Sequence, residues 1–76
     1  MEKPLLVQAE WDDDAGVWVA TSDDVPGLVT ESKTIEALMV KLESMIPDLF
    51  EANDLPMRTE SFEIVAHRLD RIKPAA

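Results

Sequence analysis

The 76-residue sequence contains no cysteine, and it has only one histidine and two glycines. Without cysteine there is no disulfide and no thiolate metal site. Two isolated glycines, Gly16 and Gly27, cannot build a glycine-rich phosphate loop. No apolar run approaches the roughly 18 residues of a membrane-spanning helix, and the first residues lack the apolar core of a signal peptide. We therefore expect a cytoplasmic protein that does not engage a membrane.

Basic residues are few. The chain has 7 Lys and Arg residues against 16 Asp and Glu residues, which gives a net charge of −9 and a pI of about 4.3. Such a chain repels phosphate backbones and lacks the basic stripe that nucleic-acid binding needs, so we expect no direct contact with nucleic acid. An acidic surface steers basic partners toward it, although in many acidic proteins the charge serves only solubility.

Hydrophobic residues make up 46% of the chain, which is too many for a disordered protein despite the charge. A length of 76 residues lies at the lower end of what folds as a single domain. Domains of this size often add disulfides, a metal or self-association to a small core. Because cysteine is absent, we expect a homo-oligomer, and a dimer first of all.

Alternating apolar residues predict a first strand over residues 5–11 and a return strand over residues 17–22, joined by an acidic loop that ends at Gly16. Pairing Trp11 with Val17 places Trp18 and Ala20 on the sheet face opposite the one that carries Trp11. A slip of one residue would exchange the two faces, and the sequence alone does not decide between the registers.

A turn over residues 22–27 and a short third strand over residues 28–30 follow. In the turn, Pro26 presets φ for its own position and Gly27 accepts the positive φ that a type II turn requires next. The apolar stripe from Ile35 to Phe50 has helical spacing, and Thr34 is a good N-cap for it. The sequence therefore predicts one long amphipathic helix that stops at residues 53–56.

A last strand is predicted over residues 61–72. The order β-β-β-α-β indicates an α+β domain, with one antiparallel or mixed sheet covered on one face by one helix. In the register that pairs Trp11 with Val17, Trp18 lies on the bare face. An exposed tryptophan beside apolar neighbours is typical of an interface, which is our hypothesis for four residues. These are Leu6, Glu10, Trp18 and Ala20. In the slipped register Trp18 would be buried instead.

Catalytic signals are weak. His67 lies between Ala66 and Arg68 on the predicted last strand, and a general base would need a placed partner and a pocket there. The acidic groups at residues 12–14 and 23–24 fall at opposite ends of one extended strand, on the order of 30 Å apart, so they cannot share a metal ion. We expect no catalytic residue, no metal site and no cofactor.

Three segments together resemble the HicB-like antitoxin domain family. They are residues 16–21 (GVWVAT), residues 24–30 (DVPGLVT) and residues 34–38 (TIEAL). The residues that carry the resemblance are the turn residues Asp24, Pro26 and Gly27, then Thr30, and Thr34 at the helix start. The match covers residues 5–52 well and the last strand loosely. It is closer still to short stand-alone prokaryotic relatives of uncharacterised function.

The resemblance implies a partial ribonuclease-H-like fold whose final strand lies beside the first. Members of the family lack the catalytic carboxylates of true ribonucleases H, neutralise a small basic RNA-cleaving toxin and form dimers or higher oligomers. Full antitoxins carry a C-terminal DNA-binding segment, whereas we expect residues 1–76 to form a single HicB-like domain without a separate DNA-binding domain.

The sequence therefore predicts a non-catalytic protein-binding module that resembles a HicB-like antitoxin and sequesters a small basic protein of the toxin kind. The alternative is a self-assembling, dimeric domain of unknown function that carries a ligand or partner surface on the open sheet face.

Overall fold

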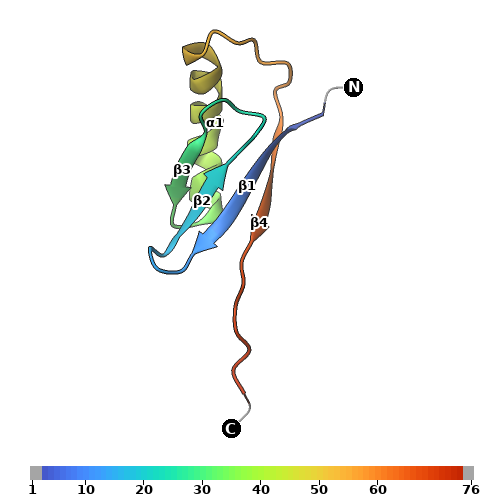
Figure 1. The fold of residues 1–76 in the computed structure, drawn as a ribbon. Coiled ribbons are helices and arrows are strands. Elements are labelled where there is room, and N and C mark those ends of the chain that lie inside the picture. Colours follow the sequence, from blue (N-terminus) through green and yellow to red (C-terminus); the bar gives the residue numbers. More distant parts are fainter. Residues whose placement is uncertain (1–2, 75–76) are drawn as a thin grey trace.

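The computed structural model describes residues 3–74, which form four strands and one helix. The elements are β1 (Leu5–Asp12), β2 (Val17–Thr21), β3 (Val29–Ser32), α1 (Ile35–Ala52) and β4 (Phe62–His67). The predicted order β-β-β-α-β and the α+β class are confirmed, with a single helix on one face of a mixed sheet (Figure 1).

The sheet has the strand order β3-β2-β1-β4. β1 pairs with β2, and β2 with β3, in antiparallel fashion, whereas β1 and β4 run parallel. A parallel pair needs a long crossover connection, which here consists of β2, β3 and α1. The last strand thus lies beside the first, as the sequence resemblance implied.

The last strand is shorter than predicted, because it ends at His67 and not at residue 72. β4 pairs along β1 up to the partners Glu10 and His67. β1 itself ends at Asp12, which in this register would face Leu69, so the residues beyond 69 have no strand beside them. Residues 68–74 instead leave the sheet as an extended tail (Figure 1).

Of the two hairpin registers that the sequence left open, the structure has the slipped one. Trp11 lies opposite Trp18, and Ala9 lies opposite Ala20. Asp12 determines this register, because its carbonyl accepts a hydrogen bond from the Gly16 amide (2.8 Å) and its carboxylate accepts two more from the loop. Gly16 has a φ of 69°, the left-handed conformation that glycine adopts without strain. Trp18 and Ala20 therefore share the face of Trp11.

The helix α1 follows the prediction closely. The Thr34 hydroxyl accepts a hydrogen bond from the Ala37 amide (3.0 Å), so Thr34 is the N-cap. The helix continues through Pro47 to Ala52. Its end is marked by Asp54 at a φ of 57° and by a hydrogen bond from the Leu55 amide to the Phe50 carbonyl.

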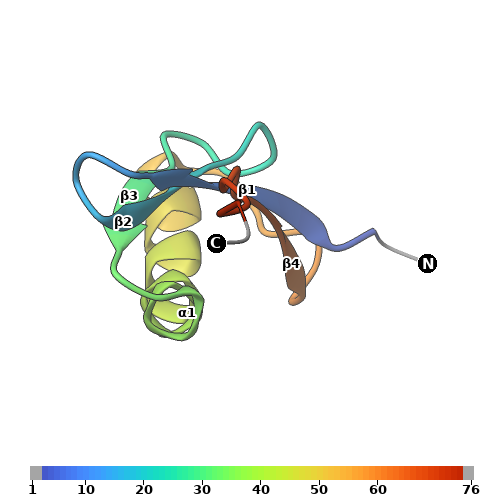
Figure 2. The same ribbon diagram turned by 90° about the horizontal axis from the view of Figure 1, so that it is seen from below.

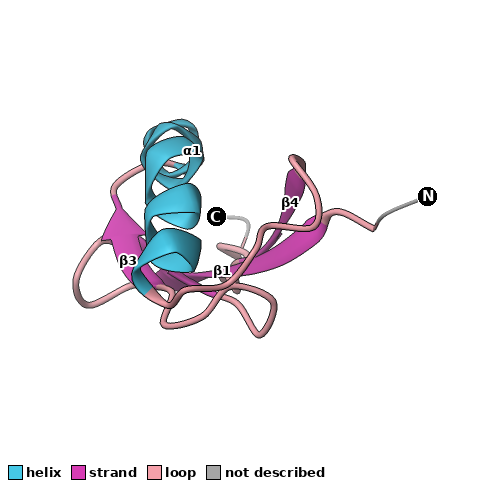
Figure 3. Ribbon diagram, turned by 90° about the horizontal axis from the view of Figure 1, so that it is seen from above, coloured by secondary structure: helices cyan, strands magenta, loops and turns pink. Residues whose placement is uncertain are grey.

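The core lies between α1 and the sheet. The helix packs over β2 and β3 and leaves the β4 side less covered, as the end-on views show (Figures 2 and 3). On β4 the side chains of Phe62 and Ile64 are half-buried, and Ala66 is exposed. The buried residues are Val7, Ala9, Ala20, Val25, Leu28, Leu38, Leu42, Ile46 and Phe50.

Candidate functional site

The turn after β2 ties the start of β1 to the rest of the fold. The Asp24 carboxylate accepts a hydrogen bond from the Leu6 amide (2.8 Å), and the Ser22 hydroxyl donates to the Leu6 carbonyl. The antiparallel ladder between β1 and β2 ends at Gln8 and Thr21. The two side chains thus satisfy the backbone groups of Leu6 where the strand pairing has stopped, because an unpaired backbone group would otherwise have to find water.

The motif residues that follow Asp24 are structural. Val25 and Leu28 are buried and form part of the core, and the Leu28 amide donates to the Val25 carbonyl (3.3 Å). Gly27 between them has a φ of 71°, as the sequence predicted for this position. Thr30 lies on the helix side of β3, opposite Ala20. The buried side chains of Val25 and Leu28 therefore close one end of the core.

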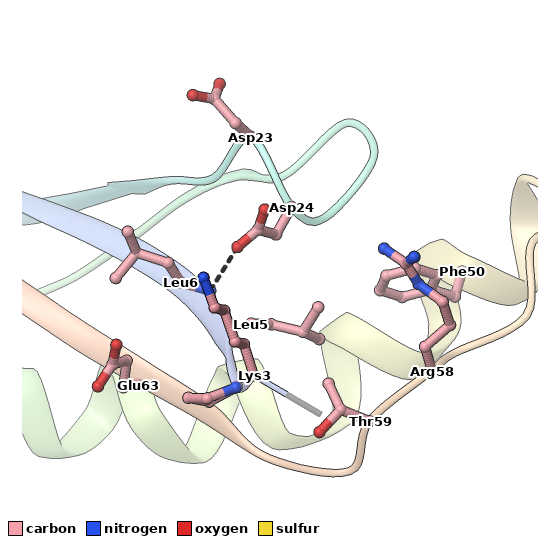
Figure 4. Close-up of a pocket in the computed structure, with 10 residues that line it drawn as sticks. Lys3, Leu5, Leu6, Asp23, Asp24, Phe50, Arg58, Thr59 and Glu63 are labelled. Carbon is pink, nitrogen blue, oxygen red and sulfur yellow. Dashed lines mark hydrogen bonds between the residues drawn. The ribbon is translucent and has the colours of Figure 1, made fainter. Parts of the chain in front are cut away.

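A cavity of about 840 Å³ opens beside this turn, at the end of the sheet where β1 begins (Figure 4). The Asp24 carboxylate points toward Leu6, whereas the Asp23 side chain points away from Leu6. Its charged lining is mixed. The lining residues are Lys3, Pro4, Leu5, Leu6, Asp23, Asp24, Phe50, Arg58, Thr59 and Glu63.

Beside this end cavity the described residues include one pair of side chains in hydrogen-bond contact, Thr59 and Ser61, whose hydroxyls lie 3.3 Å apart. His67 lies at the far end of β4, opposite Glu10. Within residues 3–74 no three His, Asp or Glu side chains gather closely enough to hold a metal ion. The end cavity therefore offers a concave surface with a lining of mixed charge.

An aromatic cluster lies at the opposite end, beside the hairpin loop. The rings of Trp11 and Trp18 meet edge to face, with centroids 5.4 Å apart. The Arg68 guanidinium lies over the Trp11 ring at 4.1 Å from its centroid, within cation–π range. The Trp11 indole donates to the Asp13 carboxylate (3.2 Å). Both tryptophans are half-buried and Trp18 packs against the core, so they complete the covered face.

The sheet face turned away from α1, called the open face here, combines carboxylates with aliphatic side chains. Side chains alternate between the faces along each strand, so the registers place the residues. Among the paired residues of the four described strands, none on the open face is Lys or Arg. The open-face residues are Leu6, Gln8, Glu10, Asp12, Val17, Val19, Thr21, Val29, Glu31, Glu63, Val65 and His67.

One row across the open face shows the pattern clearly. Val19 lies opposite Glu10 on β1 and opposite Glu31 on β3. Strands in a sheet lie about 4.8 Å apart, so the two glutamates flank Val19 at a separation of about 10 Å. Both glutamates are exposed and Val19 is half-buried. On neighbouring positions Val29 and Val65 are 68% and 44% exposed, which leaves apolar surface among the carboxylates.

The structure separates the four residues of the predicted interface. Leu6 and Glu10 do lie on the open face, but Trp18 and Ala20 lie on the helix side, and Ala20 is fully buried. The hypothesis of one surface formed by all four is therefore wrong, because it depended on the other hairpin register. Sequence reasoning missed Val19 and the glutamates of β3 and β4, which alternation and a correct register would have found.

The two acidic groups are far apart in the fold, as predicted. Asp12 begins the hairpin loop at one end of β2, and Asp24 lies beyond the other end. The carboxylates of Asp12 and Asp24 both accept hydrogen bonds from backbone amides.

Residues 3–74 include no helix that is both long and apolar enough to span a membrane.

A four-stranded mixed sheet, covered on one face by a single helix, makes residues 3–74 a small α+β domain. The chain belongs to a family described as a domain of unknown function, DUF1902, which matches residues 4–74. It is similar to a solved structure, a hypothetical protein, TTHA1013, from the extremely thermophilic bacterium Thermus thermophilus. The two are 45% identical with a TM-score of 0.72, over 93% of this chain and 99% of that one. No curated protein matches the chain.

Proposed function

We propose that this domain is a non-catalytic protein-binding module, and that its open face receives a basic protein. The observation that carries the proposal is the composition of that face, where the paired residues of the described strands include four exposed carboxylates and no Lys or Arg. The four are Glu10, Asp12, Glu31 and Glu63.

The arrangement suits a partner with both basic and apolar side chains. Lys or Arg residues of the partner would reach Glu10 and Glu31, and an apolar side chain would rest on Val19 between them. Complementary charge speeds encounter and selects the partner, while the apolar contacts contribute area removed from water. The net charge of −9 adds long-range attraction for a basic protein.

The more specific proposal is a HicB-like role, in which the domain neutralises a small basic RNA-cleaving toxin in the cytoplasm. It is supported by the turn and helix-start residues that resemble that family, Asp24, Pro26, Gly27, Thr30 and Thr34. An acidic binding face complements a basic, RNA-binding toxin, since the same lysines and arginines that contact phosphates would contact the glutamates.

The test is co-expression of the full chain with the product of the neighbouring reading frame, followed by co-purification and an RNA-cleavage assay. We expect a small basic protein to co-purify and its cleavage of RNA to stop when this chain is added in equal amount. If the neighbouring product neither forms a complex nor cleaves RNA, the toxin role is excluded.

A further inference from the structure

β4 is an edge strand whose outer backbone groups point away from the sheet. The Leu5 amide donates to the Ser61 carbonyl (2.9 Å), which establishes which residues of the last strand bond to β1. In a parallel ladder the bonding residues alternate, so Phe62, Ile64 and Ala66 direct their N–H and C=O groups outward. A strand edge of this kind is a template for another strand.

The β4 edge lacks the usual protection against such pairing. Its six residues contain no proline and no lysine, and no helix among the described residues lies across it (Figure 2). The other edge strand, β3, has only four residues. A short edge resists pairing, whereas a longer edge without such protection invites it.

We propose that the partner of this edge is the β4 strand of a second copy of the chain, paired antiparallel about a two-fold axis at Ile64. Phe62 then lies opposite Ala66 of the second copy, and the two sheets form one continuous sheet with both helices on the same side. This arrangement buries three apolar side chains per chain along the junction. It involves the sheet edge, so it does not depend on the function proposed for the open face.

Charge complementarity selects this register. With the axis at Ile64, the register continued two residues beyond the start of β4 and one beyond its end places Glu60 opposite Arg68 of the second copy. Two-fold symmetry repeats this opposite-charge pair. Moving the axis by one residue still opposes outward groups, but with the axis at Glu63 the two Glu63 side chains oppose each other, and with the axis at Val65 Arg68 faces Phe62 instead of Glu60. The first alternative opposes like charges and the second loses the opposite-charge pair.

The side chains of this pair already lie on the correct side. Glu60 lines a groove of about 290 Å³ between the start of β4 and α1, on the helix side of the sheet. Arg68 is held on the same side by its stacking over Trp11. An arginine that is stacked in place loses less conformational freedom when it forms an ion pair.

Sedimentation equilibrium of the full chain alone over a range of concentrations tests the proposal. We expect a dimer for the unchanged protein. Glu60→Lys places like charges opposite each other twice, and should weaken dimerisation by about tenfold or more. The double variant Glu60→Lys with Arg68→Glu reverses both partners and should restore the dimer to within about threefold of the unchanged protein, because the opposite-charge pair is re-formed.

A second variant tests the backbone contact. Ala66→Pro removes an outward N–H without touching the ladder to β1, and Ala66 is exposed, so we expect a folded monomer by circular dichroism and sedimentation. A monomeric unchanged protein at every concentration would overturn the proposal. A dimer that tolerates Glu60→Lys as well as the double variant does would also overturn it, even if Ala66→Pro does not fold. Neither outcome bears on binding of a basic protein by the open face.

Discussion

The carboxylate of Asp24 accepts a hydrogen bond from the backbone amide of Leu6 at 2.8 Å, across 18 residues of sequence. This bond joins the turn that carries the family resemblance to the first strand of the sheet. It explains in physical terms why an acidic residue suits this position: a carboxylate can replace the strand partner that Leu6 lacks.

Asp24→Ala should therefore destabilise the fold by about 1–2 kcal/mol, because it removes a charge-assisted hydrogen bond and leaves the Leu6 amide without its protein partner. Asp24→Asn retains an acceptor oxygen and should cost less than half as much. Urea unfolding followed by circular dichroism measures both. Equal losses for the two variants would show that the negative charge matters, not the hydrogen bond. As a further control, Asp23→Ala removes a neighbouring carboxylate that points away from Leu6 and should change little.

The N-cap gives a second prediction. Thr34→Ala removes the acceptor for the Ala37 amide and should lower the free energy of unfolding by about 1 kcal/mol. Thr34→Ser keeps the hydroxyl and should remain within a few tenths of the unchanged protein. A thermal unfolding series on the three proteins compares them, and a loss in the serine variant as large as in alanine would contradict the capping role.

Adjacent helix residues provide a third prediction. Leu38 is fully buried and Met39 is 46% exposed. Leu38→Ala should cost about 3–5 kcal/mol, since it leaves a cavity in a small core, whereas Met39→Ala should cost about 1 kcal/mol or less. Because the whole domain is marginally stable, the Leu38 variant is expected to be largely unfolded at about 37 °C by circular dichroism. Comparable unfolding midpoints would contradict the position of the core.

The stacking of Arg68 over Trp11 gives a fourth prediction. Arg68→Gln keeps much of the aliphatic stem and removes the cation, and it should shift the tryptophan emission and cost about 0.5–1 kcal/mol. Arg68→Lys keeps the positive charge and should retain part of this stabilisation. The comparison is made at concentrations where each variant has the same oligomeric state by sedimentation, so that stacking is measured apart from assembly. Unchanged emission in the glutamine variant would contradict the contact.

The sequence predicts this fold well where its signals are local. The stripe from Ile35 to Phe50, the Thr34 cap and the Gly27 turn each depend on residues close in the chain, and the structure confirms them. The hairpin register is different, because a one-residue slip preserves every alternation. It is determined by the Asp12 carboxylate and carbonyl within the loop, a detail that composition does not reveal.

The set of residues on the open face also depends on the hairpin register. Without the hairpin register, the sequence suggests that Trp18 is an exposed interface residue, although it packs beside Trp11 on the face covered by α1. With the register, Val19 lies between Glu10 and Glu31, which come from the two strands on either side of β2. Alternation alone predicts which residues share a face within one strand, but only pairing combines the strands into a surface.

Binding of a basic protein by the open face depends on the charge of that face, and one binding measurement tests this. The dissociation constant for the small basic partner is measured by calorimetry for the unchanged chain, for Glu10→Lys with Glu31→Lys, and for Asp48→Lys with Glu51→Lys on the exposed side of α1. Both pairs change the net charge equally. We predict that the open-face pair weakens binding by about 100-fold and the helix pair by about threefold or less. Equal weakening by the two pairs would show that only net charge matters, and would contradict a binding site on the open face.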